Sequence, residues 1–207
     1  MTRRRVVLAS SNAGKLAEIR RLLAPLGFEL LAQDALGIPP APENAPTFVE
    51  NALGKARAAA QASGLAAIAD DSGLEVDALG GAPGVHSARY AGTHGDNPAN
   101  IAKLLAELGA CRGASRRARF RCVAVFLAHA EHPVPLIAEG VWEGEIALKP
   151  RGAGGFGYDP VFYLPERGKT AAELDAKEKN RLSHRARAFT QLRERLEEKD
   201  WELETGD

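Results

Sequence analysis

Residues 65–74 read Leu-Ala-Ala-Ile-Ala-Asp-Asp-Ser-Gly-Leu, an apolar run that ends in two acids, a serine and a glycine. A short apolar run bounded by turn-forming residues predicts a buried strand that leads into a tight turn at 69–73. An alanine-rich stretch precedes the run, and a capping box formed by Thr47 and Glu50 predicts a helix from there to Gly64. A helix that leads directly into a buried strand is typical of α/β proteins.

Strands and helices alternate along the rest of the chain as well. The apolar spacing predicts further strands at 5–9, 28–32, 74–79, 120–128 and 136–142, helices at 16–26 and 97–108, and a loop at 38–46. A second capping box, Thr170 with Glu173, predicts a helical tail to about residue 198, interrupted near Ser183. This alternation, with two neighbouring strands in its middle, predicts an α/β fold with a mixed sheet in one domain over residues 1–207.

The charges of the chain balance, because 27 Lys and Arg stand against 27 Asp and Glu. This balance gives no whole-chain attraction to nucleic acid or to an anionic membrane, so we expect neither as a partner. No stretch approaches the ~18 to 20 apolar residues that a membrane span needs, and the first apolar run is too short for a signal-peptide core. Two cysteines outside any CxxC or metal spacing indicate a reducing compartment. We therefore expect a cytoplasmic protein.

The neighbouring acids Asp70 and Asp71 are the first candidates for chemistry. Two carboxylates at the end of an apolar strand repel each other unless a cation or hydrogen-bond donors relieve the charge. Mg²⁺ meets that need, because it takes hard oxygen ligands and completes its shell with water and phosphate oxygens. A plain Asp-Asp-Ser-Gly turn is the alternative interpretation. Glu43, in the proline-rich loop, is a candidate second metal ligand or a solvated glutamate.

Three further regions combine residue types that suit a nucleotide. Residues 10–15 lie between a strand and a helix, where backbone N–H groups and a lysine favour phosphate; a simple helix cap is the alternative. Residues 154–160 combine glycine, two aromatic rings and an acid, which suits base stacking; a glycine bulge before a core strand is the alternative. Residues 177–180 and 183–185 place cations near a helix boundary, either for phosphate and base or as a solvated face.

Taken in order along the chain, these regions closely resemble one family, the non-canonical purine NTP pyrophosphatases, also called the inosine or xanthosine triphosphatase family. The resemblance covers nearly the whole chain. The segments that carry it are LASSNAGK (8–15), TFVENA (47–52), ADDSGL (69–74), GGAPG (80–84), SARY (87–90), FGYDP (156–160) and SHR (183–185). Positions 10 and 11 depart from the family pattern, because they are Ser-Ser where Thr-Gly is common.

The resemblance implies an elongated central mixed β-sheet flanked by helices, two lobes with a cleft between them, and a homodimer. It implies Mg²⁺-dependent hydrolysis of ITP, dITP, XTP or dXTP to the monophosphate and pyrophosphate, which cleanses the nucleotide pool. Asp71 is implied as the catalytic proton acceptor and, with Glu43, as a metal ligand. The residues implied in binding the small-molecule nucleotide are Ser10, Ser11, Asn12, Ala13, Gly14, Lys15, Ser72, Phe156, Gly157, Tyr158, Asp159, Lys179, His184 and Arg185.

Two other functions remain open at this point. One is a regulatory module that binds a nucleotide without hydrolysing it. The presence of Asp70, Asp71 and Lys15 argues against that function, because binding alone does not need paired acids beside a phosphate loop. The other is a related pyrophosphatase that prefers a pyrimidine or a modified base, and only the resemblance of the 156–160 and 183–185 segments favours a purine over it.

Overall fold

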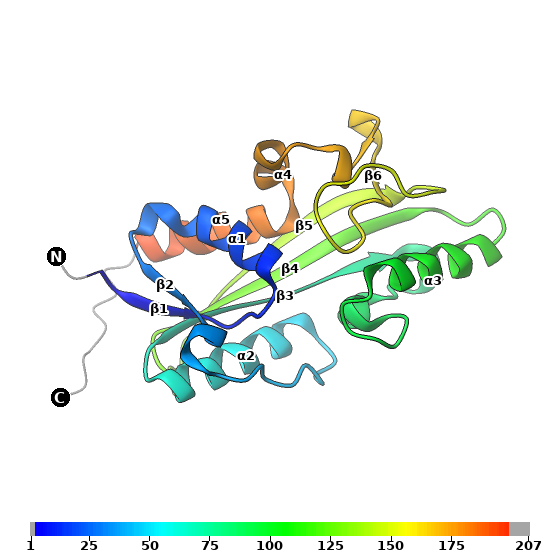
Figure 1. Cartoon of the computed structure of the whole chain (residues 1–207). Coiled ribbons are helices and arrows are strands. Elements are labelled where there is room, and N and C mark those ends of the chain that lie inside the picture. Colours follow the sequence, from blue (N-terminus) through cyan, green and yellow to red (C-terminus); the bar gives the residue numbers. More distant parts are fainter. Residues whose placement is uncertain (1–2, 199–207) are drawn as a thin grey trace. The chain divides into compact units, whose positions relative to one another are not determined.

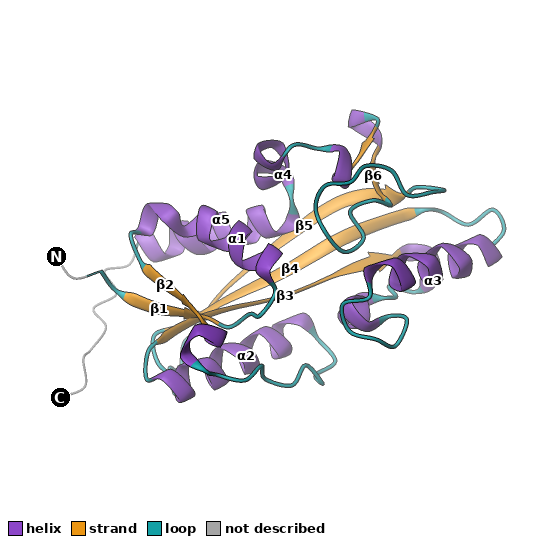
Figure 2. Cartoon of the chain, viewed as in Figure 1, coloured by secondary structure: helices purple, strands orange, loops and turns teal. Residues whose placement is uncertain are grey.

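The computed structural model describes residues 3–198 and confirms an α/β fold with a mixed sheet (Figure 2). Within these residues, seven strands form one sheet in the order β2-β1-β3-β4-β5-β6-β7. The strands are β1 (Arg5–Leu8), β2 (Glu29–Ala32), β3 (Ala66–Val76), β4 (Arg117–Leu127), β5 (Leu136–Ile146), β6 (Phe162–Leu164) and β7 (Lys169–Thr170). The α-helices are α1 (Ala13–Leu23), α2 (Phe48–Ser63), α3 (Asn97–Ala110), α4 (Ala176–Leu182) and α5 (His184–Glu197). Short 3-10 helices are η1 (Ala24–Leu26), η2 (Gln33–Leu36), η3 (Asp77–Leu79), η4 (Gly84–Arg89), η5 (Pro165–Arg167) and η6 (Ala171–Glu173).

The sheet is mixed because its two ends pair differently. β1 lies parallel to β2 and to β3, with Val6 opposite Leu30 on one side and Ala66 on the other. β6 lies antiparallel to β5 and to β7, with Phe162 opposite Ile146. The prediction that the strands near 120–128 and 136–142 are neighbours is confirmed by β4 and β5.

The chain divides into two compact units, each built from more than one stretch of sequence. Unit 1 contains the described residues up to Asp71, Val123–Gly140 and the described residues from Arg187 onward. Unit 2 contains Ser72–Cys122 and Val141–Ala186. β3, β4, β5 and α5 each carry the chain from one unit into the other. Across residues 3–198, no helix combines the length and the apolar character that crossing a bilayer requires.

Unit 1 has helices on both faces of its strands. α2 lies on one side of β1 and β3, and α1 lies on the other side with α5 (Figure 1). The buried positions of α2 recur every three or four residues, so one helical stripe faces the sheet. Four of these positions are alanines, which pack with β-strand residues into one apolar cluster. The strand members of this cluster are Val7, Ala67, Ala69, Val123, Val125 and Leu127, and Ala9 directly after β1 also belongs to it.

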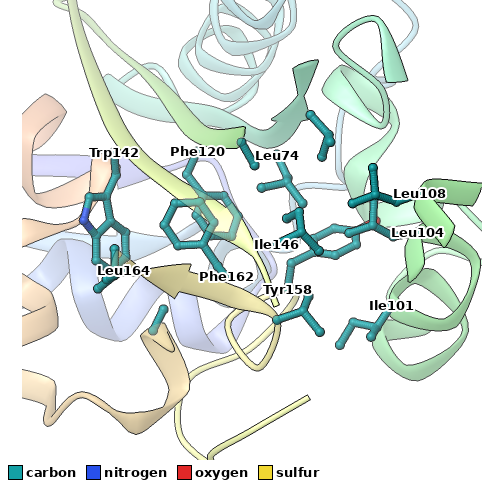
Figure 3. Packing of buried hydrophobic residues seen from close by; sticks show 14 of the residues in the cluster. Leu74, Ile101, Leu104, Leu108, Phe120, Trp142, Ile146, Tyr158, Phe162 and Leu164 are labelled. Carbon is teal, nitrogen blue, oxygen red and sulfur yellow. The ribbon is translucent and has the colours of Figure 1, made fainter. Parts of the chain in front are cut away.

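Unit 2 is built around a separate aromatic core (Figure 3). Ile101, Leu104 and Leu108 lie along one stripe of α3 and pack in the same cluster as Leu74 of β3. The rings of Phe120, Trp142 and Phe162 fill another part of the cluster, with the Phe120 and Phe162 centroids 4.5 Å apart. Neighbouring aromatic rings of this kind bury large apolar areas, so this cluster stabilises unit 2.

The predicted turn at 69–73 is wrong, because β3 runs unbroken from Ala66 to Val76 through the two acids and the glycine. The buried Leu74 and Val76 continue the apolar alternation beyond Gly73 and anchor the second half of the strand in unit 2. The composition of the segment suits a turn, but burial on both flanks favours an extended strand.

The predicted helical tail has two interruptions rather than one, because residues 171–197 form three separate helical pieces. The capping box of Thr170 and Glu173 is present, but it opens only the single 3-10 turn η6. Leu174 is then extended, and α4 begins after Asp175, whose side chain accepts a hydrogen bond from the Glu178 N–H. The predicted interruption at Ser183 is confirmed, since its backbone is extended between α4 and α5.

Candidate functional site

Asp70 and Asp71 are successive residues of β3, so their side chains leave opposite faces of the strand. Asp71 continues the face of Ala67 and Ala69, which pack in one cluster with alanines of α2. Asp70 continues the other face, and its carboxylate contacts Lys15 of α1. The exposed fraction of the side chain is 8% for Asp71 and 0% for Asp70. Each buried acid therefore requires a partner from a different helix.

Asp71 meets two polar side chains of α2. Asn51 donates from Nδ2 to Asp71 Oδ2 at 3.1 Å, and Lys55 Nζ lies 3.4 Å from Asp71 Oδ1. The same ammonium lies 2.6 Å from Oε1 of Glu43, which comes from the proline-rich loop before α2. Glu43 and Asp71 thus converge on one positive charge.

Asp70 pairs with Lys15 in the first turn of α1. Lys15 Nζ lies 3.1 Å from Asp70 Oδ2. Asn12 caps this helix, because its Oδ1 accepts a hydrogen bond from the Lys15 N–H at 3.0 Å. The cap and the strand acid together fix both ends of the lysine, its backbone and its ammonium.

The other residues of the 10–15 loop form local hydrogen bonds. Ser10 Oγ accepts from the Asn12 N–H, and Ser11 Oγ donates to Asp34 Oδ1 at 2.8 Å and accepts from Gln33 Nε2 at 3.0 Å. The next two residues are the first of α1, Ala13 and Gly14. The loop therefore presents a helix N-terminus, as predicted, with its second serine held by η2.

The charged groups of unit 1 described so far influence one another's protonation. Glu43, Asp70 and Asp71 supply three carboxylates, whereas Lys15 and Lys55 supply two ammonium groups. Burial raises the pKa of Asp71, with Glu43 and Asp70 adding to the rise, and the two lysines do not fully offset it. Burial alone would lower the pKa of Lys55, but the three acids around it together raise it.

Glu43 and Asp71 both place carboxylate oxygens beside Lys55, and such hard oxygens are the ligands that a divalent cation prefers. Within residues 3–198, no three His, Cys, Asp or Glu side chains form a group that could hold a metal ion by themselves. Mg²⁺ does not require such a group, because it commonly takes one or two carboxylates and fills its shell with water and phosphate oxygens. The convergence of Glu43 and Asp71 on one ammonium therefore fits a cation of this type.

Unit 2 contains a second polar cluster, around the ring of Phe156. Asp159 Oδ2 accepts hydrogen bonds from the Phe156 N–H at 2.9 Å and from Lys179 Nζ at 2.6 Å. Lys179 Nζ lies 4.8 Å from the centroid of the Phe156 ring, and the Arg185 guanidinium carbon lies 5.6 Å from it. Arg185 Nη2 donates to Ser72 Oγ at 3.0 Å. An aromatic face thus lies beside two buried cations, a combination that could stack on a base and donate hydrogen bonds to it.

Three predicted site residues have a different setting in unit 2. Tyr158 belongs to the core, and its hydroxyl donates to the Ser87 carbonyl oxygen at 2.9 Å. Burial raises the pKa of Tyr158. His184 is 5% exposed, and its ring stacks on Phe120 at 4.6 Å between centroids. Gly157 follows Phe156 with φ +62°. For Tyr158 the core interpretation of the sequence is therefore the one that the contacts favour.

Sequence reasoning missed Asn51 and Lys55. The signal was present, because Asn51 and Lys55 lie four residues apart on the same stripe of α2 as Ala52, Ala56 and Ala59. Polar residues on an otherwise apolar helix face need buried partners. A search for such interruptions would have paired them with the acids of the neighbouring strand.

Comparison with known proteins fits this geometry. The model of the Ham1 family matches residues 6–195, a range that includes every candidate site residue. The chain belongs to the Ham1 family. The dITP/XTP pyrophosphatase of Methylococcus capsulatus is 60% identical over 194 residues, which are 94% of this chain and 96% of that relative. The dITP/XTP pyrophosphatase of Thioalkalivibrio sulfidiphilus is 56% identical over 93% of this chain and 98% of that relative.

Solved structures of Ham1 proteins share the fold. The HAM1 protein from Coxiella burnetii is 49% identical and superposes with a TM-score of 0.89, over 95% of this chain and 100% of that chain. The Ham1 protein of Staphylococcus aureus is 40% identical with a TM-score of 0.83, over 94% of this chain and 99% of that chain. The family inferred from the sequence motifs is therefore confirmed.

Proposed function

We propose that this Ham1-family chain hydrolyses ITP, dITP, XTP and dXTP to the nucleoside monophosphate and pyrophosphate. The observation that carries the proposal is the extent of the similarity: two relatives named dITP/XTP pyrophosphatase are 60% and 56% identical over 94% and 93% of this chain. The two polar clusters agree with this reaction, because one suits phosphate chemistry and the other suits a base.

The phosphate end of the substrate is assigned to the cluster of unit 1. A nucleoside triphosphate carries about four negative charges, so its site must supply cations. Glu43 and Asp71 would hold Mg²⁺, which supplies positive charge against the phosphate oxygens when it is bound. The N-terminus of α1 supplies backbone N–H groups for phosphate, and Lys15 adds a charge beside them.

Asp71 is assigned the role of orienting or deprotonating the attacking water. The hydrogen bond from Asn51 and the contact with Lys55 hold its carboxylate in place on a buried strand, and a fixed base is what such a step needs. Lys15 is assigned to the leaving pyrophosphate, because it can place an ammonium against developing negative charge.

The base is assigned to the cluster of unit 2, with Phe156 as the stacking surface and Asp159, Lys179 and Arg185 around it. Lys and Arg side chains can only donate hydrogen bonds. A 6-oxo purine presents an acceptor at O6, whereas adenine presents an amino donor there. Two buried donors therefore favour hypoxanthine and xanthine over adenine, since a donor facing a donor leaves both groups unpaired.

The test is a product analysis with dITP, XTP, dUTP, GTP and ATP, each with Mg²⁺ and with a chelator. We expect dITP and XTP to yield pyrophosphate and monophosphate fastest, and the chelator to stop the reaction. Orthophosphate as the first product would contradict attack at the α-phosphorus. Binding without turnover would indicate the regulatory module, and preferred hydrolysis of dUTP would indicate a pyrophosphatase of different base preference.

We further infer from the family resemblance that the enzyme works as a homodimer in the cytoplasm, with nucleotides rather than nucleic acid or membranes as partners. Light scattering checks the dimer directly. A mass of about twice the 22.0 kDa of one chain is expected, and the mass of a single chain would contradict the dimer.

A further inference from the structure

The carboxylate of Asp159 organises the cluster around Phe156. A single oxygen, Oδ2, accepts both the backbone N–H of Phe156 at 2.9 Å and the ammonium of Lys179 at 2.6 Å. Asp159 is 2% exposed and Lys179 is 7% exposed, so neither charge has much access to water. The position of this oxygen therefore determines where the backbone N–H of Phe156 lies and where the Lys179 ammonium lies relative to the Phe156 ring.

Gly155 leaves the space that this oxygen occupies. A Cβ atom built on Gly155 would lie 2.0 Å from Asp159 Oδ2, 2.8 Å from its Cγ and 3.1 Å from its Cβ. Real Cβ atoms essentially never approach another heavy atom within 3.0 Å. Any side chain at position 155 must therefore displace the carboxylate or the backbone.

The backbone around the loop is fastened on both sides of Gly155. The Gly154 N–H donates to the Ala172 carbonyl oxygen at 3.1 Å, and the Ala172 N–H donates to the Asp159 carbonyl oxygen at 3.2 Å. The Arg151 N–H donates to the Pro160 carbonyl oxygen at 2.8 Å. With the main chain held at these points, the side chain of Asp159 is the part that has freedom to move.

We propose that Gly155 is a positioning residue for base recognition: by lacking a side chain, it lets Asp159 hold Phe156 and Lys179 in the arrangement that accepts the base. This inference rests on the proposed function for its assignment of the base to Phe156. Gly155 itself touches no substrate in this role. Its replacement should impair binding of the base while leaving the phosphate cluster of unit 1 unchanged.

The test compares Gly155→Ala with Gly168→Ala. Both glycines have left-handed backbones, with φ +72° and +65°, but a Cβ on Gly168 meets nothing within 4 Å. The control thus reproduces the backbone strain without the obstruction. For each variant we would measure KM and kcat with dITP, inhibition by inosine monophosphate, and inhibition by inorganic tripolyphosphate, which has no base.

Gly155→Ala is expected to raise KM for dITP and the inhibition constant of inosine monophosphate by about tenfold or more, with tripolyphosphate inhibition within about twofold of the wild type. Gly168→Ala is expected to stay within about twofold of the wild type in all three. Equal KM values for the two variants would overturn the proposal, and so would an equal loss of tripolyphosphate binding in Gly155→Ala.

A second measurement covers the case in which Gly155→Ala does not fold. Asp159→Ala removes the obstructed carboxylate, so Gly155→Ala added to it should lower the unfolding midpoint only as much as Gly168→Ala does. The proposal would be overturned if adding Gly155→Ala to Asp159→Ala lowered the unfolding midpoint clearly more than Gly168→Ala lowers that of the wild type. This cycle needs no substrate, so it separates failure of the inference from failure of the proposed function, which wild-type inactivity on dITP and XTP would reveal.

Discussion

Asn51 donates a hydrogen bond from Nδ2 to Oδ2 of Asp71 over 3.1 Å. The same amide group accepts from the Ala45 N–H at 3.0 Å and donates to the Ala45 carbonyl oxygen at 3.3 Å. One buried side chain therefore ties β3 to the loop that carries Glu43. It fixes the spacing between the two proposed metal ligands, Glu43 and Asp71.

Asn51→Ala should weaken both the fold and the response to metal. The change leaves the backbone groups of Ala45 without their side-chain partner, which should lower the free energy of unfolding by about 2–3 kcal/mol. Residues that orient metal ligands typically change metal affinity by about 10–100-fold, so the Mg²⁺ concentration for half-maximal activity should rise by that order. Urea unfolding and direct Mn²⁺ binding by electron paramagnetic resonance check the two effects separately.

Asn100→Ala is the matched control for this prediction. Asn100 is also 2% exposed and also clamps backbone, because it accepts from the Ala91 N–H at 2.7 Å and donates to the Ala88 carbonyl oxygen at 3.2 Å. It should lose comparable stability without any change in the Mg²⁺ requirement. An unaltered Mg²⁺ requirement in Asn51→Ala would contradict the proposal that Asn51 positions the metal ligands.

Lys15→Met should destabilise the metal-free protein through Asp70. The Asp70 side chain is fully buried and lies 3.1 Å from the Lys15 ammonium. Removing one partner of a buried ion pair deprives the remaining buried charge of that interaction, so we expect a loss of roughly 3 kcal/mol in chemical unfolding. Lys15→Met with Asp70→Asn should recover most of that loss, because no charge is left behind. A double variant no more stable than Lys15→Met would show that the pair is not the cause.

Asp71→Asn should lower the activity of the protein and raise its stability. Burial raises the pKa of Asp71 above its value in the unfolded chain, so the folded state binds this proton more tightly. The contribution to stability is therefore present below the unfolded pKa and is lost as the pH rises through the folded pKa. At neutral pH the neutral amide avoids that loss, and Tm should rise by a few degrees, since ~1 kcal/mol corresponds to roughly 2–4 °C at this size.

Hydrolysis of dITP should be almost abolished in Asp71→Asn, and Mg²⁺ should raise Tm in the wild type but not in the variant. Thermal unfolding across pH 4 to about 8, with and without Mg²⁺, measures the two effects on Tm, and pyrophosphate release from dITP measures the loss of activity. A near-native rate would exclude Asp71 as the proton acceptor, and a lower Tm in the metal-free variant would contradict the sign of its pKa shift.

Most of the regular structure could be predicted from local patterns, because apolar period and caps reside in neighbouring residues. The helix beginning after Thr47 and the strand beginning at Arg5 are found where the sequence predicts them. The segment around Asp70 and Asp71 could not be predicted in this way. Its local composition favours a turn, but Lys15, Asn51 and Lys55 from distant elements hold both acids within a strand.

The same distinction between local sequence patterns and tertiary contacts applies to the candidate site. Residue type and order indicated the stretches, and the family resemblance singled out Lys15, Asp71, Phe156 and Lys179 within them. The partners that fix those residues depend on tertiary contacts, so Gly155 was only one glycine among several in its loop until its distance to the neighbouring carboxylate was known.

The alternation of side chains along β3 also limits which insertions and deletions the protein can tolerate. Substituting one residue between Ala66 and Ala69 affects a single packing position, whereas inserting or deleting one would move Asp70 and Asp71 each to the opposite face. Asp70 would then face α2 and Asp71 would face α1, so Lys15 and Lys55 would each lose their present partner. We therefore expect related enzymes to vary in residue type along this segment but to keep its length constant.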